Sequence, residues 1–328
     1  MGYPNTSLSK RLGTQEMVAN GDTQGLNLSN MAIRGLVFVI TMDASQTAAP
    51  TITAIKNAIQ RIRVNVDGSD DYNIKGSTLY YLNRWFQNGK EVPTKAENTD
   101  FVRSIMLYLP FEFEGGIKSQ DTLLDLRRRA NGSLPKAYVQ FTTQLPANTT
   151  GSIDVYEDYY TLAGKERKVA FRKQFIEKSL TVTAGGSFLV PIPYGAIPDD
   201  IARMMLYTEN TSGVLQTPTL RDLKLVASEG QQYEVFNVQG VSSNSYAGIE
   251  WIFNRMAPVG DDLEGVIFKN FCPTDASGRL SKLVGSLDAS DMTDLSLQGT
   301  AGVAGELTIL LERVGLQKPA AADPYAGN

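Results

Sequence analysis

Hydrophobic and polar residues alternate in short runs along much of this 328-residue chain, and glycine-containing turns separate the runs. Ile62, Val64 and Val66 occupy every second position of one run, and Val139 and Phe141 do so in another. Alternation of β-branched and aromatic residues with polar ones indicates strands that bury one face. Turn pairs such as Asp67-Gly68 and Glu229-Gly230 break the pattern. The sequence therefore predicts an all-β fold made of sandwiches or barrels.

Helical periodicity is scarce. Residues 77–86 (STLYYLNRWF) place leucine and aromatic side chains on one helical face, with Ser77 as a candidate N-cap. Residues 120–129 (QDTLLDLRRR) form a second candidate helix. Both helices would be short insertions in the first half of the chain.

Five stretches of the first half resemble five stretches of the second half, in the same order and at a nearly constant offset. The pairs are MVANGDTQGLNLSN (17–30) with TVTAGGSFLVPIPY (181–194), IRGLVFVITMD (33–43) with DIARMMLYTEN (200–210), AIQRIRVNVDGSDDYNIKG (58–76) with LRDLKLVASEGQQYEVFN (220–237), SIMLYLPFEF (104–113) with GVIFKNFCPT (265–274), and SIDVYEDYY (152–160) with ELTILLERV (306–314). Chance matches would not stay in register. A period this long indicates a duplicated domain, since solenoid repeats run to about 20–50 residues.

These pairs divide the chain into four parts. We expect an N-terminal arm over residues 1–14, a first β-sandwich domain over 15–160, a second over 161–315 and a C-terminal tail over 316–328. The stretch TLAGKERK (161–168) is polar and charged, as a connection between domains would be.

Composition narrows the functional classes. The net charge is −4 and the isoelectric point is near 5.1, which argues against nucleic-acid binding by the whole surface. No signal peptide is apparent, and the longest apolar run (GLVFVITM, 35–42) is far shorter than the roughly 20 residues of a membrane-spanning helix.

The chain has no histidine and a single cysteine, Cys272. The absence of histidine removes the commonest general base and metal ligand, and one cysteine cannot form an internal disulfide. We therefore expect no enzymatic activity and no cofactor, and we interpret Cys272 as a packing residue.

The stretches IRGLVFVITM, AIQRIRVNVDGSDDYNIKGSTLYYLNRW and SIMLYLPFEF resemble the N-terminal half of double jelly-roll major capsid proteins. The resemblance is to coat proteins of tailless icosahedral bacteriophages with an internal membrane, the lineage that includes the adenovirus hexon. It covers about residues 15 to 315 and rests on structural motifs. It implies two tandem eight-stranded jelly-roll β-sandwiches, with short inserted helices.

The resemblance also implies partners. Three chains would form a homotrimer whose six jelly rolls make a pseudo-hexameric tile. The tiles would build an icosahedral virion shell around an internal lipid membrane, together with other capsid proteins such as a vertex penton. The protein would be made in the host cytoplasm and would bind no specific nucleic acid.

One acidic turn is a candidate cation site, because carboxylate oxygens are clustered there. Its residues are Asp67, Asp70 and Asp71. The turn lacks the acidic residue that completes an EF-hand loop, so a solvated hairpin turn is the alternative interpretation.

Basic residues are candidates for contacts with anionic lipid headgroups or with a neighbouring subunit. They are Lys10, Arg11, Arg127, Arg128, Arg129, Arg167, Lys168, Arg172 and Lys173, with Lys165 and Lys178 in the same dense cluster as the last four. A charged, solvated face is the alternative.

Two other functional classes stay open. A carbohydrate- or receptor-binding β-sandwich module, such as a viral spike, would use aromatic platforms, for which Trp85 and Trp251 are candidates against buried packing. A histidine-free glycosidase would use paired carboxylates, for which Glu112 and Glu114 are candidates. Their alternation with Phe111 and Phe113 is more simply interpreted as the polar face of a strand.

Overall fold

The computed structural model describes thirteen segments of the chain, and every statement below concerns these segments. They are residues 7–44, 48–87, 90–96, 101–112, 123–127, 133–160, 171–192, 200–216, 220–228, 232–242, 265–271, 287–288 and 294–316.

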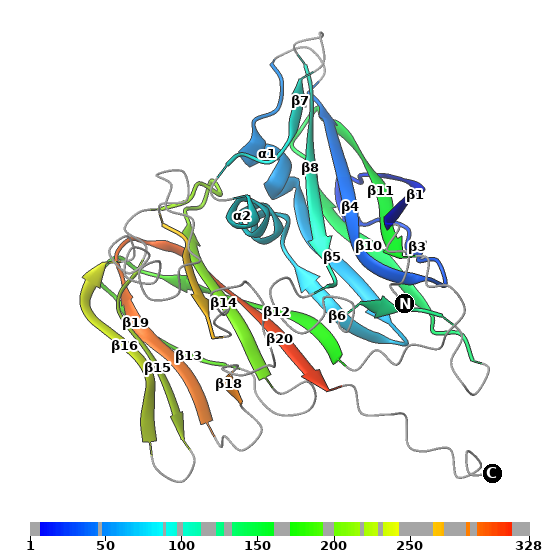
Figure 1. Cartoon of the computed structure of the whole chain (residues 1–328). Helices are drawn as coiled ribbons and strands as arrows, with labels where there is room; N and C mark the ends of the chain where they lie inside the picture. The colour runs from blue at the N-terminus through cyan, green and yellow to red at the C-terminus, as the bar shows by residue number, and fades with distance from the viewer. Residues whose placement is uncertain are drawn as a thin grey trace, which may run out of the picture.

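The first half of the chain forms a sandwich of two antiparallel sheets, called here the first sandwich (Figure 1). One sheet has the order β1 (Ser7–Glu16), β11 (Thr150–Tyr160), β4 (Ala32–Asp43), β8 (Val102–Pro110) and β7 (Thr94–Ala96), with β9 (Leu124–Asp125) beside β4. The other has the order β6 (Ser69–Ile74), β5 (Ile59–Val66), β10 (Ala137–Gln144) and β2 (Asn20–Asp22), with β3 (Leu26–Asn27) beside β10.

The second half forms the second sandwich. One sheet has the order β12 (Phe171–Val182), β20 (Gly305–Leu316), β14 (Asp200–Glu209) and β17 (Ile267–Asn270), with β18 (Leu287–Asp288) beside β14. The other has the order β16 (Gln232–Ser242), β15 (Leu220–Ser228), β19 (Asp294–Ala301) and β13 (Ser187–Pro191).

The two sandwiches have the same topology. The order β1-β11-β4-β8 in the first corresponds strand for strand to β12-β20-β14-β17 in the second. The order β6-β5-β10-β2 corresponds in the same way to β16-β15-β19-β13. The fold is therefore all-β with two tandem jelly rolls of eight principal strands each. All five sequence pairs fall on corresponding strands or on the turns beside them.

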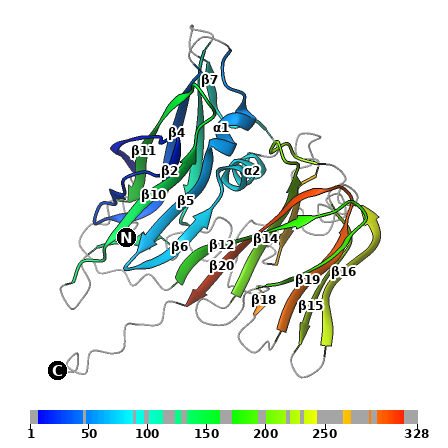
Figure 2. The same cartoon turned by 180° about the vertical axis from the view of Figure 1, so that it is seen from behind.

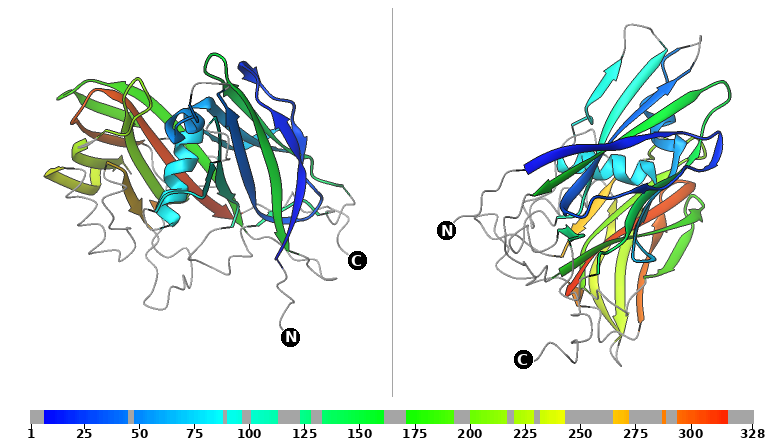
Figure 3. Two further views of the ribbon diagram at one scale, coloured as in Figure 1. Left: turned by 90° about the horizontal axis from the view of Figure 1, so that it is seen from above. Right: turned by 90° about the vertical axis from the view of Figure 1, so that its right-hand side faces the viewer.

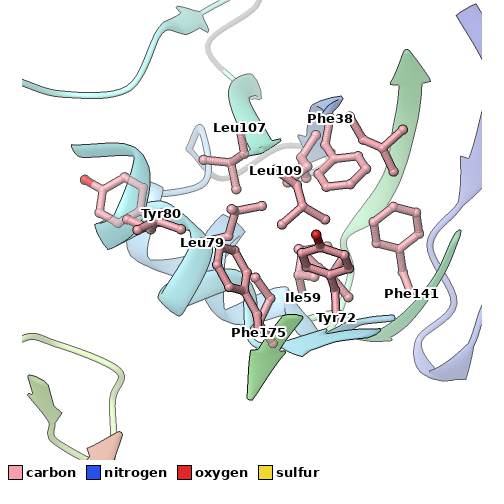
Figure 4. Close-up of a cluster of buried hydrophobic side chains, with 14 of the residues drawn as sticks. Phe38, Ile59, Tyr72, Leu79, Tyr80, Leu107, Leu109, Phe141 and Phe175 are labelled. Atoms are coloured by element: carbon pink, nitrogen blue, oxygen red, sulfur yellow. The ribbon is translucent and has the colours of Figure 1, made fainter. Parts of the chain in front are cut away.

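Each sandwich has its own hydrophobic core. In β4 the alternation is direct: Leu36, Phe38, Ile40 and Met42 are fully buried, while the residues between them are partly exposed. Aromatic residues fill the first core, where Phe38 packs edge-on against Phe141 with 5.2 Å between ring centroids (Figure 4). A separate cluster, which includes Leu206, Leu225 and Leu297, fills the second.

Two short helices lie between the sandwiches, as views from opposite sides and from above agree (Figures 1, 2 and 3). Helix α1 (Ile52–Ala58) begins at Thr51, whose hydroxyl accepts a hydrogen bond from the Ala54 amide. Helix α2 (Gly76–Phe86) is buried over Gly76 to Trp85. A helix buried on nearly every side requires partners on more than one face, and here each sandwich provides one.

A strand pair also joins the sandwiches. Strand β12 of the second pairs in parallel with β6 of the first, through Phe175 opposite Tyr72 and Ile176 opposite Asn73. One continuous ten-stranded sheet therefore runs from β17 to β2 and includes strands of both sandwiches.

Several sequence predictions about individual elements are wrong. Residues 7–14, expected in an arm, belong to β1, which pairs with β11 along its length. The described part of the second candidate helix contains β9. Ser77 is not a cap: α2 begins at Gly76, and its N-cap residue, Lys75, makes no side-chain capping hydrogen bond. The proposed connection (161–168) and the tail beyond 316 lie outside the described residues.

Candidate functional site

Helix α2 is the main element of the contact between the sandwiches. The indole ring of Trp85 stacks on Phe268 of β17, with 3.8 Å between centroids and 10° between ring planes. About one turn earlier, Tyr81 packs against Tyr207 of β14, with 4.7 Å between ring centroids. Tyr207 and Phe268 belong to the second sandwich by sequence, yet they pack into the hydrophobic cluster of the first. The apolar side chains of α2 thus connect the two sandwiches.

A carboxylate of the second sandwich lies at the N-terminus of α2. Glu177 of β12 accepts a hydrogen bond from the Lys75 amide at 2.9 Å and another from the Thr78 hydroxyl. A negative charge at this end is favoured by the exposed amides and the helix dipole. Burial nevertheless raises the pKa of Glu177, against the opposing effects of Lys75, Thr78 and Arg61. The second sandwich therefore supplies the cap that the helix lacks in its own sequence.

A buried lysine links helix α1 to the second sandwich. Lys56 forms an ion pair with Glu209 of β14 and donates to the Gly213 carbonyl at 3.0 Å. Its ammonium also lies 2.6 Å from the hydroxyl oxygen of Tyr81, which hydrogen-bonds to Glu209. Burial lowers the pKa of Lys56, and Glu209 opposes that shift. Burial also raises the pKa of Tyr81.

A second group of buried charges lies in one sheet of the second sandwich. Glu312 of β20 pairs with Lys173 of β12 at 2.7 Å and with Arg203 of β14 at 3.3 Å. Lys173 also donates to the carbonyl of Glu112, which lies two residues beyond the end of β8 in the first sandwich. Burial alone would raise the pKa of Glu312, but the two cations reverse this and lower it.

Together these contacts fix one relative orientation of the sandwiches. The contacts of Lys56 and Glu177 cross between the two halves and exist only when the halves dock in this arrangement, whereas Glu312 has its cations within its own sandwich. A buried charge without a partner is strongly unfavourable. The arrangement suits mechanical coupling of one sandwich to the other. Within the described residues, no group of three or more cysteine or acidic side chains lies close enough to hold a metal ion.

The acidic turn is a hairpin turn in the structure. Asp67 has a left-handed backbone (φ 52°) and its carboxylate accepts from the Lys136 amide at 2.9 Å. The Asp70 carboxylate accepts from Asn65, while Asp71 is buried and accepts from Gln174 of β12. The three carboxylates therefore serve separate contacts.

The structure corrects one of the predicted basic contacts. Lys173 is buried in the ion-pair group described above, so it does not face a membrane. Lys10 and Arg11 lie on β1, where Arg11 pairs with Asp154 at 2.6 Å and Lys10 donates to Ser29. Arg127 pairs with Asp125 on β9. The side chain of Arg172 and the whole of Arg128, Arg129, Arg167 and Lys168 lie outside the described structure. The helices of the described chain are too short to cross a membrane.

The candidates for the two other functional classes have structural contacts. Glu112 is buried and ion-paired with Arg34, and β8 ends at Pro110, so the prediction of a polar strand face is wrong there. Trp85 is buried, in agreement with the alternative interpretation that it is a packing residue. An open groove of about 470 Å³ over β5, β6 and β12 contains Arg61 and Arg63. These pair with Glu177 and Asp22. Glu114, Trp251 and Cys272 lie outside the described residues.

Sequence reasoning missed the interface residues. Lys56, Glu177, Glu209, Arg203 and Glu312 occur in ordinary strand and helix contexts, and a charge on an alternating strand is normally solvent-facing. One signal was available: Arg203, Glu209 and Glu312 flank the runs MMLY (204–207) and ILL (309–311), which are apolar on both faces, as is typical of strands with both faces covered.

Comparison with solved structures places the fold among viral coat proteins. The structure resembles the STIV MCP (TM-score 0.66, 13% identity, covering 95% of this chain and 97% of that one). It also resembles the major capsid protein from bacteriophage PM2, with a TM-score of 0.61 and 11% identity over 96% of this chain and 99% of that one. A third similar structure is the PBCV-1 virus capsid, with a TM-score of 0.65 and 12% identity over 97% of this chain and 98% of that one. No family model and no curated protein sequence matches the chain. The chain thus has the double jelly-roll fold of these major capsid proteins over nearly its whole length.

Proposed function

We propose that this chain is a major capsid protein, a structural subunit that assembles with copies of itself into the shell of an icosahedral virion. The observation that carries the proposal is the pair of topologically identical jelly rolls held in one orientation by buried contacts. Solved proteins with this fold, matched over at least 95% of this chain, are capsid proteins. The role is mechanical, and we assign no enzymatic step to it.

In this proposal three copies form a trimer. Two similar domains per chain give the trimer six similar units around its axis, so that an object with threefold symmetry fills a site with six neighbours. A rigid contact inside each chain suits this role, because a hinge between the sandwiches would make the shape of the tile variable. Subunit interfaces of such permanent assemblies typically bury more than about 2,000 Å².

The proposed shell encloses a lipid membrane, contains other proteins such as a vertex penton, and is assembled from protein made in the host cytoplasm. With Lys173 excluded, the basic candidates for the membrane-facing side are Lys10, Arg11, Arg127, Arg128, Arg129, Arg167, Lys168 and Arg172. Basic residues near an anionic bilayer each contribute about 1 kcal/mol to its binding.

Charge reversal tests the membrane contact. The double variant Arg167→Glu and Lys168→Glu should bind vesicles of anionic phosphatidylserine several-fold more weakly than the wild type in a flotation assay. The control is Lys224→Glu, on a strand of the second sandwich. Equal binding by all three proteins would contradict the membrane-facing assignment and leave the coat-protein role intact.

Electron microscopy of the purified protein tests the proposed function itself. Class averages should show a tile with six lobes and threefold symmetry, and concentrated samples should show sheets or shells of these tiles. A uniform population of two-lobed single chains, or of twofold dimers, would contradict the proposal.

A further inference from the structure

The two helices between the sandwiches are too short to be stable by themselves. Helix α1 has 7 residues and α2 has 11, whereas isolated helices shorter than about 12–15 residues are marginal in water even in alanine-rich sequences. The sequence of α2, GSTLYYLNRWF, consists mainly of hydroxyl-bearing and aromatic residues, which favour helix less than alanine or leucine does. The helical structure of both segments therefore depends on what packs against them.

The last turn of α1 is anchored on the second sandwich. The Lys56 ammonium donates to the Glu209 carboxylate and, at 3.0 Å, to the Gly213 carbonyl, while its third acceptor is the Tyr81 hydroxyl of α2. If the second sandwich moved away, Lys56 would lose two of these three acceptors at a position that is only 3% exposed. A buried ammonium without partners is strongly unfavourable, so α1 could not keep Lys56 where it is.

Helix α2 depends on the second sandwich at both ends. At its N-terminus, Lys75 makes no side-chain capping hydrogen bond, and Glu177 of β12 accepts from the Lys75 amide and the Thr78 hydroxyl instead. Near its C-terminus, the Trp85 ring stacks on Phe268 of β17. Without the second sandwich, α2 would lose both its cap and the partner of its largest side chain.

The part of the second sandwich that receives α1 is a turn over residues 209–216, called here the template turn. The Asn210 side-chain oxygen accepts from the amides of Ser212 and Val214 at 2.9 and 3.0 Å, and the Gly213 amide donates to the Asn210 carbonyl at 2.9 Å. Asparagine turns of this kind are determined by their own local hydrogen bonds. The template turn can therefore keep its shape without the helices, whereas the helices cannot keep theirs without the second sandwich.

We propose that α1 and α2 form a latch that folds only against the docked second sandwich, with the template turn as the preformed surface. Undocking unfolds both helices while the central strands of the first sandwich stay paired, because β4 is hydrogen-bonded to β11 and β8 along its length. Completion of the first sandwich is thereby made conditional on a correctly folded and docked second one. The inference concerns a single chain and goes beyond its proposed role in a shell.

Hydrogen exchange of the wild-type chain tests the latch, measured by mass spectrometry at increasing low concentrations of urea. Peptides that cover 52–58 and 76–86 should open together and exchange at least about tenfold faster than peptides from β4 and β11, because they open locally rather than with the whole domain. Exchange of the two helices only in step with these strands would overturn the proposal.

A wedge at Gly213 tests the template turn. A Cβ atom there would lie 2.6 Å from Asn57 Cγ of α1, whose side-chain amide donates to the Ser212 carbonyl at 3.3 Å. Gly213→Leu should push α1 off the turn and speed exchange of both helices by about tenfold or more, with β4 and β11 unchanged. Gly185→Leu is the matched control, because Gly185 has a similar φ (71° against 69°) and open space around its Cβ position. Both variants bear the same backbone cost of leucine at positive φ.

The outcomes separate the latch from simpler packing. If the helices of Gly213→Leu are as protected as those of Gly185→Leu, the second sandwich is not their template and the proposal is wrong. Loss of protection in β4 and β11 together with the helices would overturn it equally, because no separate latch would then exist. If Gly213→Leu does not fold, the wild-type measurement still decides. Self-assembly is measured separately by light scattering, so the proposed function does not depend on these results.

Discussion

Single residues at the contact between the sandwiches act through buried charge. Glu312 is the clearest case, because it lies between Lys173 and Arg203 and all three are almost inaccessible to solvent. Burying an ion pair contributes little net stability compared with apolar packing. Removing one partner, however, leaves the other charge buried without compensation for its lost hydration, which is strongly destabilising. The three residues lie in one sheet of the second sandwich, and Lys173 connects them to the first through the Glu112 carbonyl.

Replacing this carboxylate should be strongly destabilising. Glu312→Gln leaves two buried cations without their anion and should lower the free energy of unfolding by about 3–5 kcal/mol in urea denaturation. The control is Glu306→Gln on the same strand, whose ion pair with Lys75 is half exposed and is worth about 0–1 kcal/mol. Equal losses in the two variants would contradict the account of the buried pair.

The same pair predicts a pH dependence. The pKa of Glu312 is lower in the folded protein than its ordinary value of about 4.3, so the unfolded chain binds the proton first as the pH falls. The stability due to ionised Glu312 is present above pH of about 4.3 and is lost as the pH falls toward the folded pKa. The difference between the wild type and Glu312→Gln should therefore shrink below about pH 4. A constant difference from pH 7 to pH 3 would contradict this assignment.

At the scale of elements, helix α2 depends on close approach to its neighbours. A Cβ atom at Gly76 would lie 2.5 Å from the Lys56 carbonyl oxygen and 2.6 Å from the Ile59 Cβ, so glycine is required where α2 begins beside α1 and β5. The helix can then reach Phe268 with Trp85 and Tyr207 with Tyr81.

An added methyl group tests this packing. Gly76→Ala should reduce stability by about 1–3 kcal/mol, because backbone atoms must move to admit it. In Gly13→Ala, the new Cβ would meet a leucine side chain at 3.4 Å, an ordinary contact distance, so a smaller loss is expected. Thermal unfolding of both variants compares them, and a harmless Gly76→Ala would show that α2 can shift without cost.

The sequence predicted elements best where one pattern determined them. Alternation and duplication identified the fold class and the corresponding strands, since burial of one sheet face leaves a period of two, and helical periodicity identified the α2 region. Strand β1 was missed because its sequence, SLSKRLGTQE, has few apolar residues, and its strand structure comes from pairing with β11. The interface charges were missed for a related reason: a strand sequence does not reveal which neighbour covers its second face.

At the scale of the whole molecule, the two sandwiches are equivalent in topology but not in surroundings. Within one chain, the second sandwich presents its outward sheet face and the edge of β12 to the first. In the described structure the matching edge strand of the first sandwich, β1, pairs only with β11. A chain in which one sandwich has this edge paired and the other has it open is suited to assembly with further copies.

The most direct test of this account is the mass of the purified protein in solution, measured by light scattering. Three copies of the 35.8 kDa chain give about 107 kDa, and the account predicts a stable species of that mass or shells built from it. A species of one chain at every concentration would contradict it.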